Sequence, residues 1–178
     1  MNKLNSRNHY LWRGVFIVVM VMQLISCAAT GNLTKDEYRK LAKASIKLGL
    51  DIDKDDDHAL YLESANWIGV PYRSGSRSKR GTDCSGLVWN IYKNVYHRSL
   101  GKSSNDQRVN DCKKIRKSSL QAGDLVFFHN GRSKKRASHV GIYLKDRKFI
   151  HSSSSYGVIV SSLDEDYWQR HWLSAGRP

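Results

Sequence analysis

Cys84 is the side chain with the clearest potential for covalent chemistry in this sequence. It lies in the run Asp83-Cys84-Ser85-Gly86, between a loop rich in Gly, Ser and basic residues and a segment, 85–96, with helical spacing of apolar residues. A thiol at the start of a helix faces unpaired N–H groups and the positive end of the helix dipole, and both favour the nucleophilic thiolate. A backbone N–H of Cys84 or Ser85 can also point at an oxyanion. We therefore predict a cysteine nucleophile at residue 84.

Two histidines, His139 and His151, are the candidates for the base that such a nucleophile needs. They stand in β-rich runs, 139–144 and 148–151, that flank one hairpin. A two-residue turn would place the two imidazoles on opposite faces of that hairpin. A three-residue turn, 145–147, would place them on one face as diagonal neighbours, about 7 Å apart at Cβ.

The apolar residues of the hairpin favour the three-residue turn. In that register Gly141 lies opposite His151 and leaves room beside it, while the apolar side chains point together into a core: Val140, Ile142, Leu144 and Ile150. His139 can then act as the base, and His151 can hold it in the productive tautomer, as the third member of a catalytic triad does.

Other roles for these side chains have less support. An inert buried thiol at Cys84 is disfavoured by its polar neighbours and by the Gly-containing loop before it. A disulfide between Cys84 and Cys112 stays open as an alternative. Zinc bound by these two cysteines and the two histidines is disfavoured because no short C-x-x-C or H-x-x-x-H pair is present. We expect no metal ion and no organic cofactor.

The elements that position these residues change in kind along the chain. Helical spacing of apolar residues predicts helices over 34–50, 58–68 and 85–96. After Asp124 the spacing becomes strand-like, in four short β-rich runs at 125–128, 139–144, 148–151 and 158–161. Helices followed by an antiparallel meander predict an α+β fold, with the N-terminal helices packed on a small antiparallel sheet.

The acidic run 51–57 has some features of a calcium-binding loop. Its sixth position is Asp56 where the loop needs Gly, and its twelfth is Leu62 where a bidentate Glu is needed. We therefore favour an acidic loop that ends at Asp57 as the N-cap of a helix.

The first 26 residues have the proportions of a secretory signal. Lys3, Arg7 and Arg13 precede an apolar run, 14–22, that is shorter than the roughly 20 residues of a membrane span. The following Leu24-Ile25-Ser26-Cys27 resembles the bacterial lipoprotein signal, in which the cysteine is lipidated. Ala28 after that cysteine resembles the outer-membrane sorting pattern.

These features predict three regions. We expect a lipoprotein signal peptide at 1–26, a tether and short amphipathic helix at 27–57, and a catalytic domain at 58–178. The predicted location is the bacterial cell envelope, with a lipid anchor at Cys27 in the outer membrane, facing the periplasm.

The charge of the chain predicts an anionic partner. Thirty Lys and Arg against 16 Asp and Glu give +14, and loss of 1–26, with its three basic residues, would leave +11. The basic runs 77–80 and 132–136 either flank the substrate groove or are solvated loops. No nucleic-acid partner is expected, because no recognised binding motif is present. We expect a monomer.

Several motifs, in order, resemble the NlpC/P60 family of bacterial cell-wall cysteine peptidases, which have a papain-like core. They are Pro71-Tyr72-Arg73, Gly81-Thr82-Asp83-Cys84-Ser85-Gly86-Leu87-Val88, Gly123-Asp124-Leu125-Val126-Phe127-Phe128, His139-Val140-Gly141-Ile142-Tyr143 and Phe149-Ile150-His151.

The resemblance implies roles for individual residues. Cys84 would be the nucleophile, His139 the general base and acid, and His151 the polar third residue. Tyr72 matches a family tyrosine whose hydroxyl reaches the catalytic cysteine and helps to stabilise the oxyanion. Asp83 would hold the loop or contact a substrate amine, and the segment 100–107 would form a wall of the groove through Ser104 and Gln107, although Gly101-Lys102 replaces the usual Pro-Arg there.

The implied reaction is hydrolysis of amide bonds in peptidoglycan stem peptides, typically between D-glutamate and a diamino acid. An amidase or acyltransferase on the same core is a rival, because the triad acts on many acyl groups. An inactive wall-binding lipoprotein is a rival from another class.

Overall fold

The computed structural model describes residues 33–178, and residues 35–178 form one compact unit. The predicted signal peptide and the predicted lipidation site at Cys27 lie outside the described residues. Among the described helices, none is both long and apolar enough to cross a membrane.

Three helices form the N-terminal half of the unit: α2 (Lys35–Leu48), α3 (His58–Trp67) and α4 (Cys84–Tyr96). They lie within a few residues of the predicted ranges. Helix α2 packs on α3, and α3 packs on α4. Asp57 caps α3 as predicted, because its side chain accepts a hydrogen bond from the backbone N–H of Leu60 at 3.1 Å.

The acidic loop before α3 is joined to the sheet by a lysine. Lys145 Nζ lies 2.7 Å from a carboxylate oxygen of Asp53 and 2.8 Å from one of Asp56. The ammonium group thus bridges the two carboxylates and joins the acidic loop to the segment between β5 and β6.

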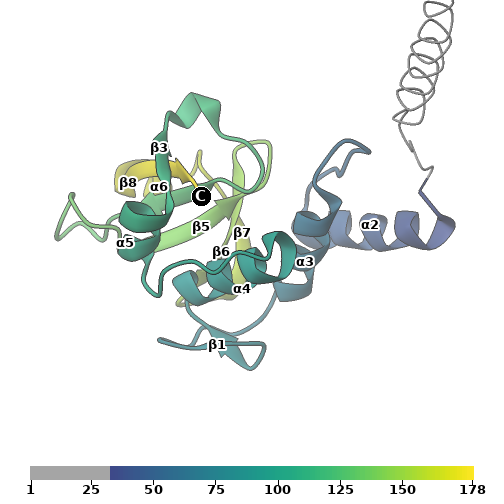
Figure 1. Ribbon diagram of the computed structural model, residues 1–178, viewed down its shortest axis with the longest axis horizontal. Coiled ribbons are helices and arrows are strands. Elements are labelled where there is room, and N and C mark those ends of the chain that lie inside the picture. Colours follow the sequence, from purple (N-terminus) through teal and green to yellow (C-terminus); the bar gives the residue numbers. More distant parts are fainter. Residues whose placement is uncertain (1–32) are drawn as a thin grey trace, which may run out of the picture. The chain divides into compact units, whose positions relative to one another are not determined.

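The second half of the unit is dominated by an antiparallel sheet (Figure 1). Within residues 33–178 its order is β3-β8-β4-β5-β6-β7. The four predicted runs are β4 (Leu125–Phe128), β5 (His139–Tyr143), β6 (Lys148–Ser153) and β7 (Gly157–Ser162). Two strands that the sequence did not predict extend the sheet past β4, namely β8 (Trp172–Arg177) and β3 (Lys113–Ile115).

Shorter elements connect these pieces. A two-stranded ribbon, β1 (Arg77–Ser78) with β2 (Gly81–Thr82), precedes α4. Between α4 and β4 lie α5 (Ser104–Asp106), a π-helical turn (Gln107–Asp111) and a 3-10 turn (Lys117–Ser119). The last helix, α6 (Asp166–His171), lies between β7 and β8.

The sheet buries apolar side chains on both faces. Helix α4 packs against β5 and β6, so the main core joins helix residues such as Leu87 and Ile91 to strand residues such as Val140 and Ile150. On the opposite face a smaller cluster gathers Val126, Phe128, Phe149, Leu163 and Trp168. This two-sided burial explains why four consecutive apolar residues form β4, since alternate positions serve different cores.

Candidate active site

The start of α4 is held in place by Asp83. One carboxylate oxygen, Oδ1, accepts hydrogen bonds from the backbone N–H of Gly86 at 2.7 Å and from the hydroxyl of Ser85 at 3.1 Å. The other, Oδ2, accepts one from the N–H of Gly75 at 2.7 Å. Both oxygens therefore bind groups of the chain itself, which supports the loop-holding role of Asp83 rather than a contact with substrate.

Cys84 is the first residue of α4, and its sulfur is largely enclosed. The residue is 8% exposed, and Sγ lies 3.4 Å from the hydroxyl oxygen of Ser104. Burial raises the pKa of the thiol, and this effect outweighs the hydrogen bonds from Ser104 and from the backbone N–H groups of Val140 and Ser85, which lower it. At rest Cys84 is therefore a neutral thiol and not the predicted thiolate. The backbone N–H of Ser85 at the helix start lowers the pKa of the thiol, but burial raises that pKa by more.

The hairpin that carries the histidines has the predicted register. Ile142 pairs with Ile150 and Tyr143 with Phe149, and the N–H of Leu144 donates to the carbonyl of Lys148 at 2.9 Å. The turn therefore has three residues, two of which adopt positive φ, namely Asp146 and Arg147.

That register places the two imidazoles in direct contact. Nε2 of His139 lies 2.9 Å from Nδ1 of His151, and the ring planes meet at 81°. Gly141 provides the space as predicted, since a Cβ there would lie 2.5 Å from Cδ2 of Phe149 and 2.8 Å from the carbonyl oxygen of Ile150.

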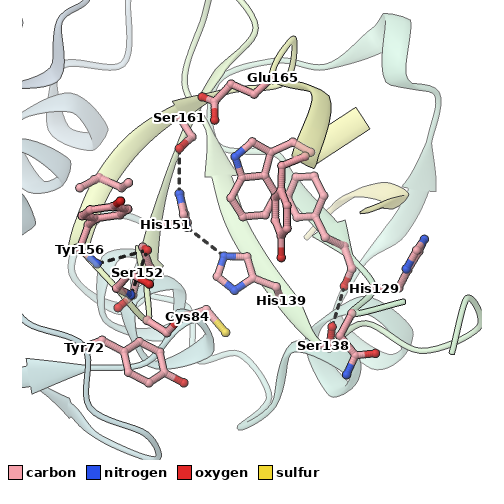
Figure 2. A pocket seen from close by; sticks show the side chains of 18 residues that line it. Tyr72, Cys84, His129, Ser138, His139, His151, Ser152, Tyr156, Ser161 and Glu165 are labelled. Atoms are coloured by element: carbon pink, nitrogen blue, oxygen red, sulfur yellow. Dashed lines mark hydrogen bonds between the residues drawn. The ribbon is translucent and has the colours of Figure 1, made fainter. Parts of the chain in front are cut away.

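Figure 2 shows the Cys84 sulfur next to the His139 ring, on the side of the ring turned away from His151. Because Nε2 of His139 is engaged by His151, the nitrogen that remains for the sulfur is Nδ1. Within residues 33–178, no hydrogen bond joins the sulfur to this ring, and Ser104 is its hydrogen-bonded side chain instead. Such catalytic hydrogen bonds often tighten only once substrate is bound.

The histidine pair packs against the ring of Trp168, and the second histidine also contacts a serine hydroxyl. Trp168 stacks on His139, with ring centroids 5.4 Å apart, and meets His151 edge-on at 4.8 Å. Nε2 of His151 lies 3.1 Å from the hydroxyl oxygen of Ser161. Neither Trp168 nor Ser161 was predicted from the sequence, although strand alternation from His151 could have suggested a polar partner on β7.

Burial keeps both histidines neutral at pH 7. It lowers the pKa of His139 to about 4. It lowers the pKa of His151 well below its ordinary value, and the neighbouring His139 adds to that shift. The site therefore pairs a neutral thiol with a neutral imidazole at rest.

A cleft of about 620 Å³ opens onto Cys84, His139 and His151. Tyr72 forms part of its wall and is 37% exposed. Figure 2 shows the tyrosine ring beside Cys84. Partial burial raises the pKa of Tyr72, and the nearby Cys84 and Asp83 add to the effect, so its hydroxyl stays protonated and can donate a hydrogen bond.

The other predicted site residues lie around the sulfur or beneath it. The hydroxyl of Ser85 lies within hydrogen-bond distance of two acceptors, the carboxylate of Asp83 and the carbonyl of Lys102, the latter at 3.0 Å. Gln107 is fully buried, and its Nε2 donates to the carbonyls of Ser85 and Gly101, each at 3.0 Å. This placement gives Gln107 a supporting position below α4 and does not support a contact with substrate.

The two alternatives for the cysteines were a disulfide and a metal site. Cys84 and Cys112 are both free thiols. Over the described part of the chain, no three His, Cys, Asp or Glu side chains are grouped so that they could hold a metal ion. What the arrangement can perform is acyl transfer, with a thiol nucleophile, an imidazole base and a second imidazole behind it.

The fold and the site define a cysteine-type peptidase, and comparison with known proteins gives its family. The family model described as "NlpC/P60 family" matches residues 69–177. The chain is 32% identical over 178 residues to a protein of Escherichia coli (strain K12) named "Murein DD-endopeptidase MepS/Murein LD-carboxypeptidase", covering 94% of this chain and 93% of the relative. The chain therefore belongs to the NlpC/P60 family.

Further relatives agree with this assignment. "Murein DD-endopeptidase MepH" of E. coli K12 is 42% identical over 113 residues, which are 62% of this chain and 41% of that protein. A solved NLP/P60-family structure from Staphylococcus aureus Mu50 aligns with a TM-score of 0.61 at 32% identity. That alignment covers 71% of this chain and 42% of the staphylococcal one, so this chain matches less than half the length of that protein.

Proposed function

We propose that this protein is a peptidoglycan endopeptidase that hydrolyses amide bonds in cell-wall stem peptides. The observation that carries the proposal is a thiol at a helix start beside an imidazole whose Nε2 lies 2.9 Å from a second imidazole. All three side chains line one cleft. The substrate class is supported by the E. coli relatives, which are named murein endopeptidases.

In the proposed mechanism, His139 removes the proton from Cys84 as the sulfur attacks the amide carbonyl. The S–C bond forms while the carbonyl electrons move to oxygen, and the oxyanion is stabilised by the Tyr72 hydroxyl and the backbone N–H of Ser85. Collapse breaks the C–N bond, and His139 gives its proton to the leaving amine. Water, deprotonated by His139, then cleaves the thioester, and the thiol is restored.

General-base activation suits this site because neither group is ionised at rest. Burial raises the pKa of Cys84 and lowers that of His139, so proton transfer accompanies attack instead of preceding it. His151 would hold the imidazolium that forms transiently, as the third residue of a triad does.

The relatives favour one bond over another. Both E. coli proteins carry the term DD-endopeptidase in their names, which favours a D,D bond of a peptide cross-link for this chain as well. The bond between D-glutamate and a diamino acid, which the sequence motifs implied, is the competing candidate.

Mass analysis of digested peptidoglycan separates the two bonds and tests the function itself. Cleavage of D,D cross-links converts dimeric fragments into monomers with intact stems, whereas cleavage after D-glutamate leaves shortened stems. We expect the first outcome. Release of neither product by wild-type protein would contradict the proposed function, and release of whole stems from the glycan would indicate an amidase.

The proposed cellular arrangement follows from the N-terminal motif. Residues 1–26 would be removed, Cys27 would carry the lipid, and the catalytic unit would face the periplasm from the outer membrane. Metabolic labelling with a radioactive fatty acid should label the wild-type protein and leave Cys27→Ala unlabelled. Equal labelling of both proteins would refute the anchor.

A further inference from the structure

A chain of three hydrogen-bonding groups lies behind the nucleophile. From the sulfur outward it consists of His139, His151 and Ser161, joined at 2.9 Å between the rings and at 3.1 Å from His151 Nε2 to the serine hydroxyl. Figure 2 shows these two contacts as a continuous line leading away from Cys84. The direction in which hydrogens are donated along this line decides whether His139 can act as a base.

Each neutral imidazole carries one N–H, so the line allows two arrangements. In the first, His139 Nε2–H donates to His151 Nδ1, and His151 Nε2–H donates to Ser161. His139 Nδ1, next to the sulfur, then carries a free lone pair. In the second, every donor is reversed, Nδ1 of His139 carries the hydrogen, and the ring has no lone pair to offer Cys84.

Ser161 is positioned to favour the first arrangement. It lies on β7 directly opposite Phe149, while His151 is opposite Ile159, so Ser161 and His151 are diagonal neighbours on one face of the sheet. The residue is 9% exposed and lines the cleft, so solvent in the cleft can accept the hydroxyl's own hydrogen while the oxygen accepts from His151.

We propose that Ser161 is a positioning residue that accepts the Nε2–H of His151 and thereby fixes both imidazoles in the tautomers that leave Nδ1 of His139 free to deprotonate Cys84. The inference rests on the proposed function in that it takes Cys84 and His139 as nucleophile and base.

Loss of the Ser161 oxygen should reverse the direction in which the two imidazoles donate their hydrogens. His151 is 2% exposed, and Trp168 meets its ring edge-on at 4.8 Å. Without the Ser161 oxygen the Nε2–H of His151 would have no acceptor among the described residues of the protein, and a buried N–H without an acceptor is unfavourable. The hydrogen of His151 then moves to Nδ1, where it can donate to His139, and His139 must carry its own hydrogen on Nδ1. The base would be blocked without any change in the fold.

The test compares Ser161→Ala, Ser161→Thr and the control Ser162→Ala in the full chain. Ser162 is the next residue on β7, and its hydroxyl accepts from the N–H of Asp164 at 3.1 Å, outside the cleft. We expect Ser161→Ala to lower kcat about 10- to 100-fold, the range found when a metal-binding histidine loses the partner of its other ring nitrogen, with KM within about twofold. Ser161→Thr, which keeps the oxygen, and Ser162→Ala should stay near wild-type kcat.

Nitrogen-15 spectra of the histidine side chains provide a readout that a purely structural effect would not move. In wild type, Nδ1 of His139 should give the signal of an unprotonated nitrogen, and in Ser161→Ala that of an N–H. Unchanged nitrogen signals in Ser161→Ala overturn the proposal whether or not kcat falls, and so does an unchanged kcat.

Failure of this inference can be told apart from failure of the proposed function. If wild type releases amines from peptidoglycan and Cys84→Ala does not, the function stands even when Ser161→Ala behaves as wild type. If wild type releases none, the function fails, and the nitrogen spectra still decide whether Ser161 sets the tautomers.

Discussion

His139 and His151 face each other across neighbouring strands, with 2.9 Å between Nε2 and Nδ1 and an angle of 81° between their rings. This contact uses the nitrogen of His139 that lies farther from the sulfur and leaves Nδ1 for Cys84. It depends on one glycine, since any side chain at 141 would collide with the neighbouring strand. The catalytic pair and the register of the hairpin are thus one structural feature.

Replacement of Gly141 by Ala should damage both stability and activity. A Cβ there would lie 2.5 Å from Cδ2 of Phe149 and 2.8 Å from the carbonyl of Ile150, so β5 and β6 must separate. We expect a loss of about 1–3 kcal/mol in the free energy of unfolding, as for other overpacked cores, and a lower kcat. Urea unfolding measures the first, and a stability equal to that of wild type would refute the close packing.

Replacement of His139 by Ala should remove the base and leave the fold intact. General-base catalysis typically contributes 10²- to 10⁴-fold, so kcat should fall by about that factor. His97→Asn is the matched control, because His97 caps the far end of α4 in a left-handed conformation that Asn tolerates. Amine release from peptidoglycan measures both variants, and a His139→Ala protein as active as the control would contradict the assignment of the base.

Replacement of Asp83 by Ala should lower kcat by more than the accompanying loss of stability can explain. Asp83→Ala removes the cap of α4 and the bond to Gly75, and loss of an N-cap typically costs about 1 kcal/mol. Asp57→Ala removes the corresponding cap of α3, away from the cleft. We expect both variants to unfold at lower urea concentration and only Asp83→Ala to lose kcat. Equal activity of the two would show that the cap of α4 does not position Cys84.

Tyr72→Phe tests the proposed oxyanion donor. The hydroxyl lies in the cleft beside Cys84, and removing one such donor typically lowers kcat about 10²- to 10³-fold. Tyr38→Phe, on an exposed part of α2, is the control and should match wild type. If Tyr72→Phe keeps its full kcat, the oxyanion must be held by backbone N–H groups alone.

Stability should fall as the pH drops below that at which an ordinary histidine titrates. Burial lowers the pKa of His139 to about 4, whereas an unfolded histidine titrates near 6.5. Between these values the unfolded chain binds more protons, so the free energy of unfolding decreases as pH falls from about 6.5 to about 4. Urea unfolding at pH 7 and pH 5 measures the decrease, which should be smaller in His139→Gln. An identical decrease in that variant would show that other groups cause it.

The sequence predicted those parts of the site that depend on local patterns. Alternation of Val140, Ile142 and Leu144 set the hairpin register, and with it the contact between the histidines. Helical spacing of the apolar residues over 85–96 predicted a helix directly after the cysteine, and α4 begins at Cys84.

The parts that escaped prediction depend on contacts between distant segments. Strand β3 is a short basic run, and β8 contains Ser and Gly, so neither has a strand-like pattern of its own; they pair with each other across about 60 residues of sequence. Trp168 reaches the histidines from a short helix that has no periodicity to reveal its buried side. The neutral state of Cys84 follows from burial, which is a property of the packed site and not of the helix start.

The central claim is that Cys84 forms the covalent intermediate, and intact-protein mass spectrometry of acid-quenched enzyme tests it most directly. During turnover of soluble peptidoglycan fragments, the wild-type protein should gain the mass of the acyl half of the cleaved peptide, and the added group should map to Cys84. Cys84→Ala should gain nothing and release no amine. An adduct on another residue, or equal hydrolysis by Cys84→Ala, would contradict the account.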